Sequence, residues 1–250
     1  MASNAVNRVQ VLRVHTPTAS YPVVIGAGLL RECGQRLRRL SPGRPRLFVI
    51  SSPRVWRLWG RPLAAGLRAA SVSFDVLLMH DREKDKRLAT VEKLADELLT
   101  HGADRGSLLA AFGGGVVGDV TGFLATTYMR GVSYIQIPTT LVAQADAALG
   151  GKTGVNLRAG KNLLGAFHHP QAVFADTTTL ATLPGRDYRA GLYEVVKCAV
   201  IGDPFLFRFL EQNLLPVVAR HPGALQTALV RAMRLKARIV SRDEHETHLR

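Results

Sequence analysis

The sequence contains few cysteines, and neither Cys33 nor Cys198 belongs to a metal-binding or redox motif. Two isolated thiols exclude a disulfide framework and fit a reducing compartment. The chain also lacks an uninterrupted apolar run of the ~18 residues that a membrane-spanning helix needs. Its first residues, MASNAVNRVQVLRV, lack the apolar core of a signal peptide. We therefore predict a cytoplasmic protein that does not enter a membrane.

Acidic residues are scarce relative to basic ones. The chain has 19 Asp and Glu against 33 Lys and Arg, a formal net charge of +14. Such an excess can be a solvated arginine-rich surface, or it can attract nucleic acid, a membrane surface or a phosphorylated metabolite. Aromatic residues make up 6% of the chain, and the arginines are scattered along it. Both features argue against nucleic-acid binding, which depends on clustered charge and aromatic stacking.

Strand-like and helical patterns alternate along the first part of the chain. The stretches Arg8–His15 and 21–26 predict a β-hairpin, and the apolar run Arg46–Ser51 predicts a buried strand. Further strands are expected at 73–79 and 107–112, with an amphipathic helix between them. This alternation predicts an α/β fold with a largely parallel sheet.

The pattern changes at Pro184-Gly185, after which strand-like runs stop and helical ones follow. We predict an α/β domain over residues 1–183 and the start of an all-helical domain over 184–250. The last helical pattern has no stop signal before Arg250. An incomplete helical domain should expose an apolar face.

Glycine and functional polar groups are concentrated in the stretch 111–170. Gly113-x-Gly115-x-x-Gly118 follows a predicted strand and opens a helix, an arrangement that lets backbone N–H groups approach a pyrophosphate. The alternative is a tight turn without a ligand. The motif comes after several strands, whereas a standard Rossmann domain carries it at the first βα turn.

Two further groups in this stretch suit an anionic ligand. Thr139 and Thr140 end a predicted strand, where open α/β sheets bind ligands, although threonine also caps helices. Lys152 and Lys161 lie next to glycine turns and suit a phosphate or carboxylate. The alternative for these lysines is a solvated surface position.

Glu194 and Lys197 are spaced i, i+3 on a helix that is apolar nearly all round. They therefore share one helix face. The alternatives are a surface ion pair and a half-buried pair, and the half-buried pair would be a candidate for metal binding or proton transfer.

Five ordered segments together resemble 3-dehydroquinate synthase. They are GGGVVGDVTGFLATTYMRG, IPTTLVAQADAALGGKTGVN, GKNLLGAFHHP, LATLPGRDYRAGLYEVVK and KARIVSRDEHETHLR, and the likeness extends over nearly the whole chain. It implies a Rossmann-like α/β NAD-binding domain followed by a helical domain that binds a divalent metal, zinc or cobalt.

The resemblance also implies a reaction. Members of this family convert 3-deoxy-D-arabino-heptulosonate 7-phosphate to 3-dehydroquinate and phosphate in the shikimate pathway, which leads to chorismate and the aromatic amino acids. NAD is regenerated in each turnover. The alternatives are another sugar phosphate cyclase, forming a valiolone or an inosose, a polyol dehydrogenase, and a basic protein that binds nucleic acid.

The resemblance assigns roles by position. The NAD-binding set is Asp81, Glu83, Lys86, Gly113, Gly114, Gly115, Val116, Val117, Gly118, Asp119, Thr139, Thr140, Lys152, Lys161, Thr179, Leu180, Ala181 and Thr182. Contacts to the phosphorylated sugar-acid substrate are implied for Asp146, Lys152, Asn162, Lys197, Lys236 and Arg250. Glu194 is implied as a metal ligand, and Arg130 as a phosphate contact offered to the partner subunit of a homodimer.

The chain departs from the family pattern at several positions. The two histidine ligands of the family lie beyond the position matched by Arg250, so we expect a fragment that is inactive because it cannot complete the zinc site by itself. Ala147 and Ala148 stand where serines are frequent, Ser52 where an acidic or amide residue is common, and His248 where glycine is usual.

Overall fold

The computed structural model describes residues 9–41, 43 and 45–247. Its strands are β1 (Gln10–His15), β2 (Ser20–Gly26), β3 (Leu47–Ser51), β4 (Phe74–Leu78), β5 (Leu108–Gly113), β6 (Ser133–Pro138), β7 (Lys152–Leu157), β8 (Gly160–Phe167) and β9 (Val173–Asp176). Within the described residues, seven strands form one sheet in the order β1-β2-β9-β6-β5-β3-β4, and β7 pairs with β8 separately.

The helices follow the alternation that the sequence predicts. They are α1 (Leu29–Leu40), α2 (Pro53–Ala69), α3 (Leu88–Thr100), α4 (Gly115–Thr127), α5 (Gly185–Gly202), α6 (Pro204–Val218) and α7 (Pro222–Arg242). Short 3-10 turns are η1 (Glu83–Asp85), η2 (Tyr128–Arg130) and η4 (Thr177–Thr182), and η3 (Ala143–Ala147) is a π-helix.

The main sheet is parallel except at one edge. The predicted hairpin is confirmed, because β1 and β2 pair antiparallel. From β2 to β4 every neighbouring pair is parallel. All residues of β3 and β5 are buried, as expected for parallel strands with helices on both faces. The predicted α/β class is therefore confirmed.

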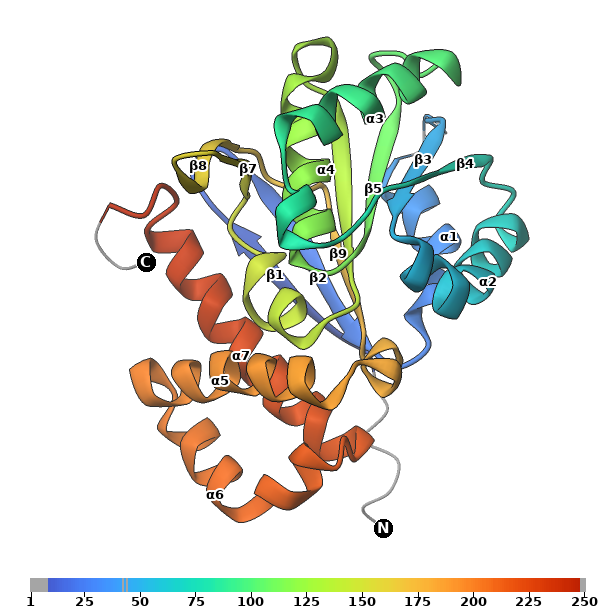
Figure 1. The fold of residues 1–250 in the computed structure, drawn as a ribbon. Coiled ribbons are helices and arrows are strands. Elements are labelled where there is room, and N and C mark those ends of the chain that lie inside the picture. The colour runs from blue at the N-terminus through green and yellow to red at the C-terminus, as the bar shows by residue number, and fades with distance from the viewer. Residues whose placement is uncertain (1–8, 42, 44, 248–250) are drawn as a thin grey trace.

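Three groups of helices pack against the sheet: α1 with α2, α3 with α4, and α5 to α7 (Figure 1). Alternate residues of β3 point to opposite sides: Val49 joins the core beneath α1 and α2, whereas Phe48 and Ile50 join the core beneath α3 and α4. Val23 and Ile25 of β2 face α5–α7 in a third cluster. The helical part thus packs on the β1–β2–β9 end of the sheet.

The chain after Leu183 is helical throughout its described residues, and α5 begins at Gly185. These helices share a buried cluster with the sheet, since Val173 of β9, Tyr188 of α5 and Met233 of α7 belong to it together. The division into domains at residue 183 stays a prediction.

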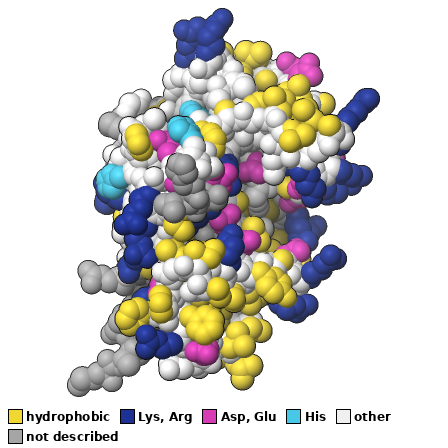
Figure 2. Space-filling view, turned by 90° about the vertical axis from the view of Figure 1, so that its left-hand side faces the viewer, with side chains coloured by type: hydrophobic (Ala, Val, Ile, Leu, Met, Phe, Trp, Pro, Cys, Tyr) yellow, Lys and Arg dark blue, Asp and Glu magenta, His cyan; other side chains and the backbone are white. Residues whose placement is uncertain are grey.

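The helical part exposes the apolar surface that the sequence predicts. Tyr193 is 75% exposed, Phe205 67% and Leu215 79%, and all three lie on α5 and α6. Figure 2 shows hydrophobic side chains gathered on the lower part of one face. In the part of the chain that the structure describes, no helix combines the length and apolar character needed to cross a membrane.

Candidate functional site

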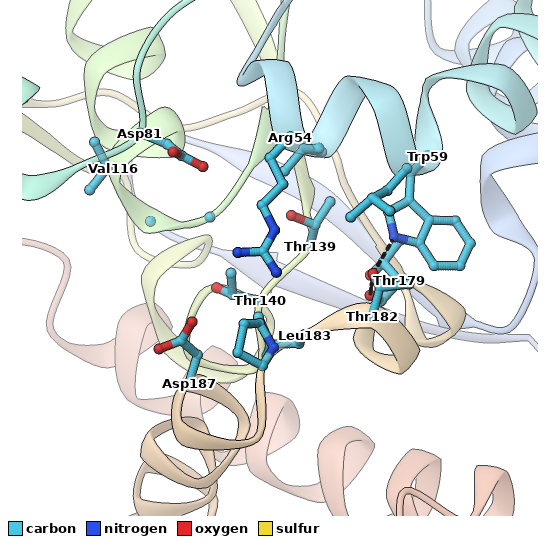
Figure 3. A pocket seen from close by; sticks show the side chains of 15 residues that line it. Arg54, Trp59, Asp81, Val116, Thr139, Thr140, Thr179, Thr182, Leu183 and Asp187 are labelled. Atoms are coloured by element: carbon cyan, nitrogen blue, oxygen red, sulfur yellow. Dashed lines mark hydrogen bonds between the residues drawn. The ribbon is translucent and has the colours of Figure 1, made fainter.

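A cleft opens where the strand order of the main sheet reverses. The chain leaves β3 for β4 on one side and returns to β5 on the other, so α2 and α4 both begin at the carboxyl edge between β3 and β5. Open α/β sheets bind ligands at such a point. The cleft holds about 340 Å³, and its lining includes Arg54, Val55, Leu58, Trp59, Asp81, Gly114, Gly115, Val116, Thr139, Thr140, Thr179, Thr182, Leu183, Pro184 and Asp187 (Figure 3).

The floor of the cleft is the turn that starts α4. Gly114 is the N-cap residue of α4, and having no side chain it cannot cap the first N–H groups of the helix. A Cβ at Gly114 would lie 3.0 Å from Thr140 Cγ2, tighter than normal packing permits. Glycine therefore lets the turn lie this close to Thr140, two residues after β6. Free N–H groups at a helix N-terminus suit a pyrophosphate.

The opposite wall comes from α2 and η4. The Arg54 side chain extends into the cleft between Asp81 and Asp187 (Figure 3). Trp59 Nε1 donates to Thr182 Oγ1 at 2.8 Å, which closes one end of the cleft. A guanidinium facing a helix N-terminus adds to the attraction for phosphate. Sequence reasoning missed Arg54 and Trp59, which no motif surrounds, and gave no role to Asp187, although it lies within the segment LATLPGRDYRAGLYEVVK.

The predicted NAD-binding residues fall into three groups. Eight of them line the cleft: Asp81, Gly114, Gly115, Val116, Thr139, Thr140, Thr179 and Thr182. Gly113, Val117, Gly118 and Leu180 are buried beneath its surface, and Ala181 is exposed beside it. Glu83, Lys86, Asp119, Lys152 and Lys161 belong to polar contacts outside the lining. Their direct contact with a nucleotide stays a prediction.

A second group of charges centres on Asp146 of the π-helix η3. Lys236 Nζ of α7 lies 2.6 Å from Asp146 Oδ1, and Lys197 Nζ of α5 lies 3.9 Å from the same atom. Burial opposes ionisation, but Lys236, Lys197 and Lys152 together hold the pKa of Asp146 below its usual range. The carboxylate therefore stays ionised at neutral pH and fixes the positions of the amines.

Lys197 also forms an ion pair with Glu194, its neighbour on α5. The pair is half-buried, with 48% of the Lys197 side chain and 29% of that of Glu194 exposed. Burial works against the charged amine, yet Glu194 and Asp146 raise the pKa of Lys197 above its usual range. Figure 2 shows acidic and basic side chains side by side around a hollow in the middle of one face.

The described residues do not by themselves fit a metal ion. Within the ranges that the structure describes, no three His, Cys, Asp or Glu side chains group closely enough to hold one. Glu194, the predicted ligand, has its carboxylate paired with Lys197. A zinc site needs about four ligands, and the single carboxylate of Glu194 could supply one of them.

A third polar group joins the loop after β4 to the β7–β8 hairpin. Lys86 is 3% exposed, and its Nζ contacts Asp119 Oδ2 of α4 and Asn162 Oδ1 of β8. Burial raises the pKa of Asp119, while Lys86 acts in the opposite direction. Lys152, at the start of β7, pairs with Glu246 Oε1 at 2.7 Å and is 46% exposed.

Of the remaining predicted residues, Lys161 is a surface lysine, with 74% of its side chain exposed and 3.8 Å between its Nζ and Glu83 Oε1. Arg130 is exposed in η2 with φ +69°, and its contact with a partner subunit stays a prediction.

His248 and Arg250 lie outside the described residues. Ser52 caps α2 by accepting from Val55 N at 3.3 Å, and Ala148 is buried in the core, so both departures have structural roles.

Arg220, between α6 and α7, fixes one wall of the cleft. Its guanidinium donates to the carbonyls of Leu180 at 2.9 Å, Ala181 at 2.8 Å and Leu183 at 2.7 Å. It also lies over the Tyr188 ring, 4.5 Å from the centroid. These bonds satisfy the carbonyls at the end of η4, the segment that presents Thr179 and Thr182 to the cleft. The helical part thereby supports the cleft from outside.

We expect Arg220→Met to weaken a dinucleotide's affinity for the cleft by about fivefold, because charge-assisted hydrogen bonds to three carbonyls are lost. Titration of the nucleotide with fluorescence detection measures the change. Arg208→Met is the matched control, since Arg208 also lies over an aromatic ring, that of Phe205 on α6. Equal losses in both variants would show that ring stacking, and not the carbonyl contacts, is responsible.

Family models and curated proteins of known name are similar to this chain. The family model described as 3-dehydroquinate synthase N-terminal matches residues 76–190, and that described as 3-dehydroquinate synthase C-terminal matches residues 191–250. A 3-dehydroquinate synthase of Solibacter usitatus is 46% identical over 95% of this chain and 65% of its own length. That of Neisseria meningitidis serogroup C is 43% identical over 96% of this chain and 67% of its own length. The chain thus spans about two thirds of the length of the curated relatives that it matches.

Solved structures share the fold. A 2-epi-5-epi-valiolone synthase of Streptomyces hygroscopicus with NAD+ and Zn2+ bound is 34% identical, with a TM-score of 0.83 over 97% of this chain and 66% of that one. A 2-deoxy-scyllo-inosose synthase complexed with carbaglucose-6-phosphate, NAD+ and Co2+ is 28% identical, with a TM-score of 0.85 over 95% of this chain and 64% of that one. An iron-containing alcohol dehydrogenase of Thermotoga maritima, at 13% identity and a TM-score of 0.70, shows the fold alone.

Proposed function

The chain belongs to the 3-dehydroquinate synthase family, and on this premise we propose that it binds NAD in the cleft and takes part in converting 3-deoxy-D-arabino-heptulosonate 7-phosphate to 3-dehydroquinate and phosphate. One observation supports this most strongly. The turn that starts α4 abuts the π-helix carrying Asp146, since a Cβ at Gly115 would lie 3.7 Å from Ala147 Cβ. A nucleotide on the turn would therefore end beside the lysine cluster.

The chain's own residues would divide the work of binding. The N–H groups at the start of α4, together with Arg54, suit the pyrophosphate. Trp59 and Thr182 would close the far end of the cleft around the nucleotide. NAD, when bound, supplies a hydride acceptor for a substrate hydroxyl and returns the hydride within the turnover. The cleft would shield that exchange from water.

The lysine cluster suits a doubly anionic substrate. Lys197 and Lys236 converge on Asp146, and Lys152 acts on the same carboxylate. With its pKa held low, Asp146 would orient the amines and would not deliver protons. With its pKa held high, Lys197 would stay cationic and stabilise the phosphate or carboxylate of the substrate. These groups favour binding and electrostatic stabilisation over general acid-base transfer.

The related cyclases are the second candidates. Identity to the 3-dehydroquinate synthases, at 43% to 46%, exceeds the 34% identity to the valiolone synthase and the 28% identity to the inosose synthase. These values favour the dehydroquinate reaction. A homodimer to which Arg130 contributes, and a cytoplasmic location, belong to the same proposal and rest on the resemblance and on the isolated thiols.

Intrinsic fluorescence offers a direct test. The chain has two tryptophans, Trp56 and Trp59, both on α2, and Trp59 lines the cleft. We expect NADH to quench their emission saturably, with a Kd in the micromolar range, about 1–100 μM. The heptulosonate phosphate should tighten this binding more than glucose 6-phosphate, which lacks a carboxylate. Absence of saturable quenching would contradict the proposal.

The product distinguishes the candidate reactions. The 250-residue chain alone is expected to form no product, because its described residues do not complete a metal site. When a protein that also carries the two histidine ligands implied by the family resemblance is incubated with the heptulosonate phosphate, NAD and zinc, NMR analysis should show 3-dehydroquinate and inorganic phosphate. Net accumulation of NADH would instead indicate a polyol dehydrogenase. Salt-sensitive DNA binding without NAD affinity would indicate a nucleic-acid-binding protein.

A further inference from the structure

A β-bulge in the β7–β8 hairpin redirects Asn156. The register of the two strands shifts between Val155 and Leu157, which leaves Asn156 outside the regular ladder. Bulges commonly turn a residue toward a new partner. The freed N–H of Asn156 donates to the Lys86 carbonyl at 2.8 Å, and its carbonyl accepts from Arg87 Nη1 at 3.4 Å. The backbone of the hairpin is thereby joined to the loop after β4.

The Asn156 side chain extends this junction in two directions. Its Nδ2 donates to the Glu83 Oε1 at 2.8 Å and to the Glu83 carbonyl at 3.2 Å. Its Oδ1 accepts from Asn162 N at 2.8 Å. Asn156 is 7% exposed, whereas the Glu83 side chain is 46% exposed, so the amide is shielded from water more than its carboxylate partner. One amide thus binds the loop with its nitrogen and the hairpin with its oxygen.

Asn162 has a φ of +56°, a left-handed conformation that Asn adopts more readily than most residues with a side chain, and the bond from its N–H to Asn156 Oδ1 holds it there. In this conformation Asn162 presents its Oδ1 to Lys86 Nζ, which also contacts Asp119. Asn156 therefore stabilises the geometry that joins Lys86 to Asn162. These contacts form a continuous chain from Glu83, through Asn156 and Asn162, to Lys86 and the α4 residue that it contacts.

We propose that Asn156 is a positioning residue that couples the loop Asp81–Lys86 to the β7–β8 hairpin, so that the nucleotide side and the substrate side of the site are held in one arrangement. The inference rests on the proposed function for the roles of the two sides. The alternative is that Asn156 stabilises the hairpin alone. The two differ in whether disturbance of Asn156 reaches the loop.

The test uses Asn156→Asp, which keeps the oxygen that accepts from Asn162 and replaces the donor facing Glu83 by a second acceptor. The charged groups around this position are Glu83, Lys86, Arg87, Lys161 and Asp119. At pH 8 the two carboxylates repel each other despite the neighbouring cations. At pH 5 a shared proton can restore a bond to Glu83. Asn156→Ala has no titratable group and serves as the reference.

We expect the Kd of NADH for Asn156→Asp to rise about tenfold at pH 8 and to stay within about twofold of the unmodified chain at pH 5. Asn156→Ala should raise the Kd by the same factor at both pH values. Asn213→Asp is the control, because it makes the same chemical change in α6, where Asn213 Nδ2 donates to the Phe209 carbonyl. A loss for Asn156→Asp that does not depend on pH would overturn the proposal.

Hydrogen exchange in the ligand-free chain separates this inference from NAD binding itself. Both Asn156 variants should exchange faster in residues 82–87 as well as in residues 160–163. Faster exchange in the hairpin only would show that Asn156 has a local role, and the coupling would be refuted. If the unmodified chain failed to bind NADH while both segments responded, the proposed function would fail and the coupling would stand.

Discussion

A chain carrying Gly115→Asp should fold normally and bind NADH about a hundredfold more weakly than the unmodified chain. Gly115 is the first residue of α4 and lines the cleft. An aspartate there would place a carboxylate where the pyrophosphate should lie, with repulsion between like charges. The same carboxylate interacts favourably with the helix dipole, so the thermal midpoint should be unchanged or slightly higher. Fluorescence titration and thermal unfolding together measure the two effects.

Gly115→Ala is the matched control for this variant. A Cβ at Gly115 would have Ala147 Cβ as its nearest neighbour at 3.7 Å, an ordinary van der Waals distance. Alanine should therefore fit, and the Kd should change by no more than about threefold. If the aspartate variant bound NADH as tightly as the alanine variant, the N-terminus of α4 would not be the pyrophosphate site.

The alternation of strands and helices that forms the main sheet follows from local patterns. The apolar run at positions 47–50 is buried on both faces of the sheet, which requires helices on both sides. The patterns failed in the segment from Lys152 to Phe167, which forms a hairpin that sequence reasoning treated as glycine turns. Burial alternates along β8 only from Leu163 to Phe167, and Gly154 and Gly165 pack backbone against backbone, so the period-2 signal is short. The four residues of β9 are too few to show a period.

Sequence reasoning placed residues in the cleft correctly where a motif directly follows a strand. Gly114, Gly115, Thr139 and Thr140 all line the cleft. The contact of Asp146 with Lys236 joins a π-helix to the last helix, and no periodicity links residues so far apart in sequence. Only the family resemblance had grouped them. Charge clusters of this kind depend on tertiary packing, which one sequence does not reveal.

Sequence reasoning gave no role to three further residues, Arg54, Trp59 and Asn156, because their contacts too depend on tertiary packing. Each acts through a single geometric circumstance: a helix that begins at the strand crossover, a hydrogen bond across the cleft, or a bulge that frees an amide. Their residue types are ordinary for an exposed helix or a strand. The roles proposed for them rest on the contacts that surround them.

The second large effect concerns stability, at the crossing of α1 and α2. A Cβ at Gly66 would lie 2.5 Å from the carbonyl oxygens of Leu30 and Arg31, and one at Gly34 would lie 2.4 Å from the Gly66 carbonyl oxygen. The two helix backbones touch, so no side chain can move aside to make room. Gly66→Ala should force the helices apart and lower the free energy of unfolding by about 2 kcal/mol, even after its gain in helix propensity. Urea denaturation measures the change as a midpoint lower by about 1 M.

Gly185→Ala makes the same change where space exists, because the nearest atom to its Cβ would be Arg189 Nη1 at 3.5 Å, the end of a flexible side chain. That variant should be as stable as the unmodified chain or slightly more so. Folded Gly66→Ala should bind NADH normally, since Gly66 lies about 18 Å along α2 from Arg54 at the cleft. An unchanged midpoint would mean that α1 and α2 can separate at little cost. A weakened Kd with an unchanged midpoint would mean that the crossing sets the position of Arg54, and the helix pair would then belong to the site and not only to its support.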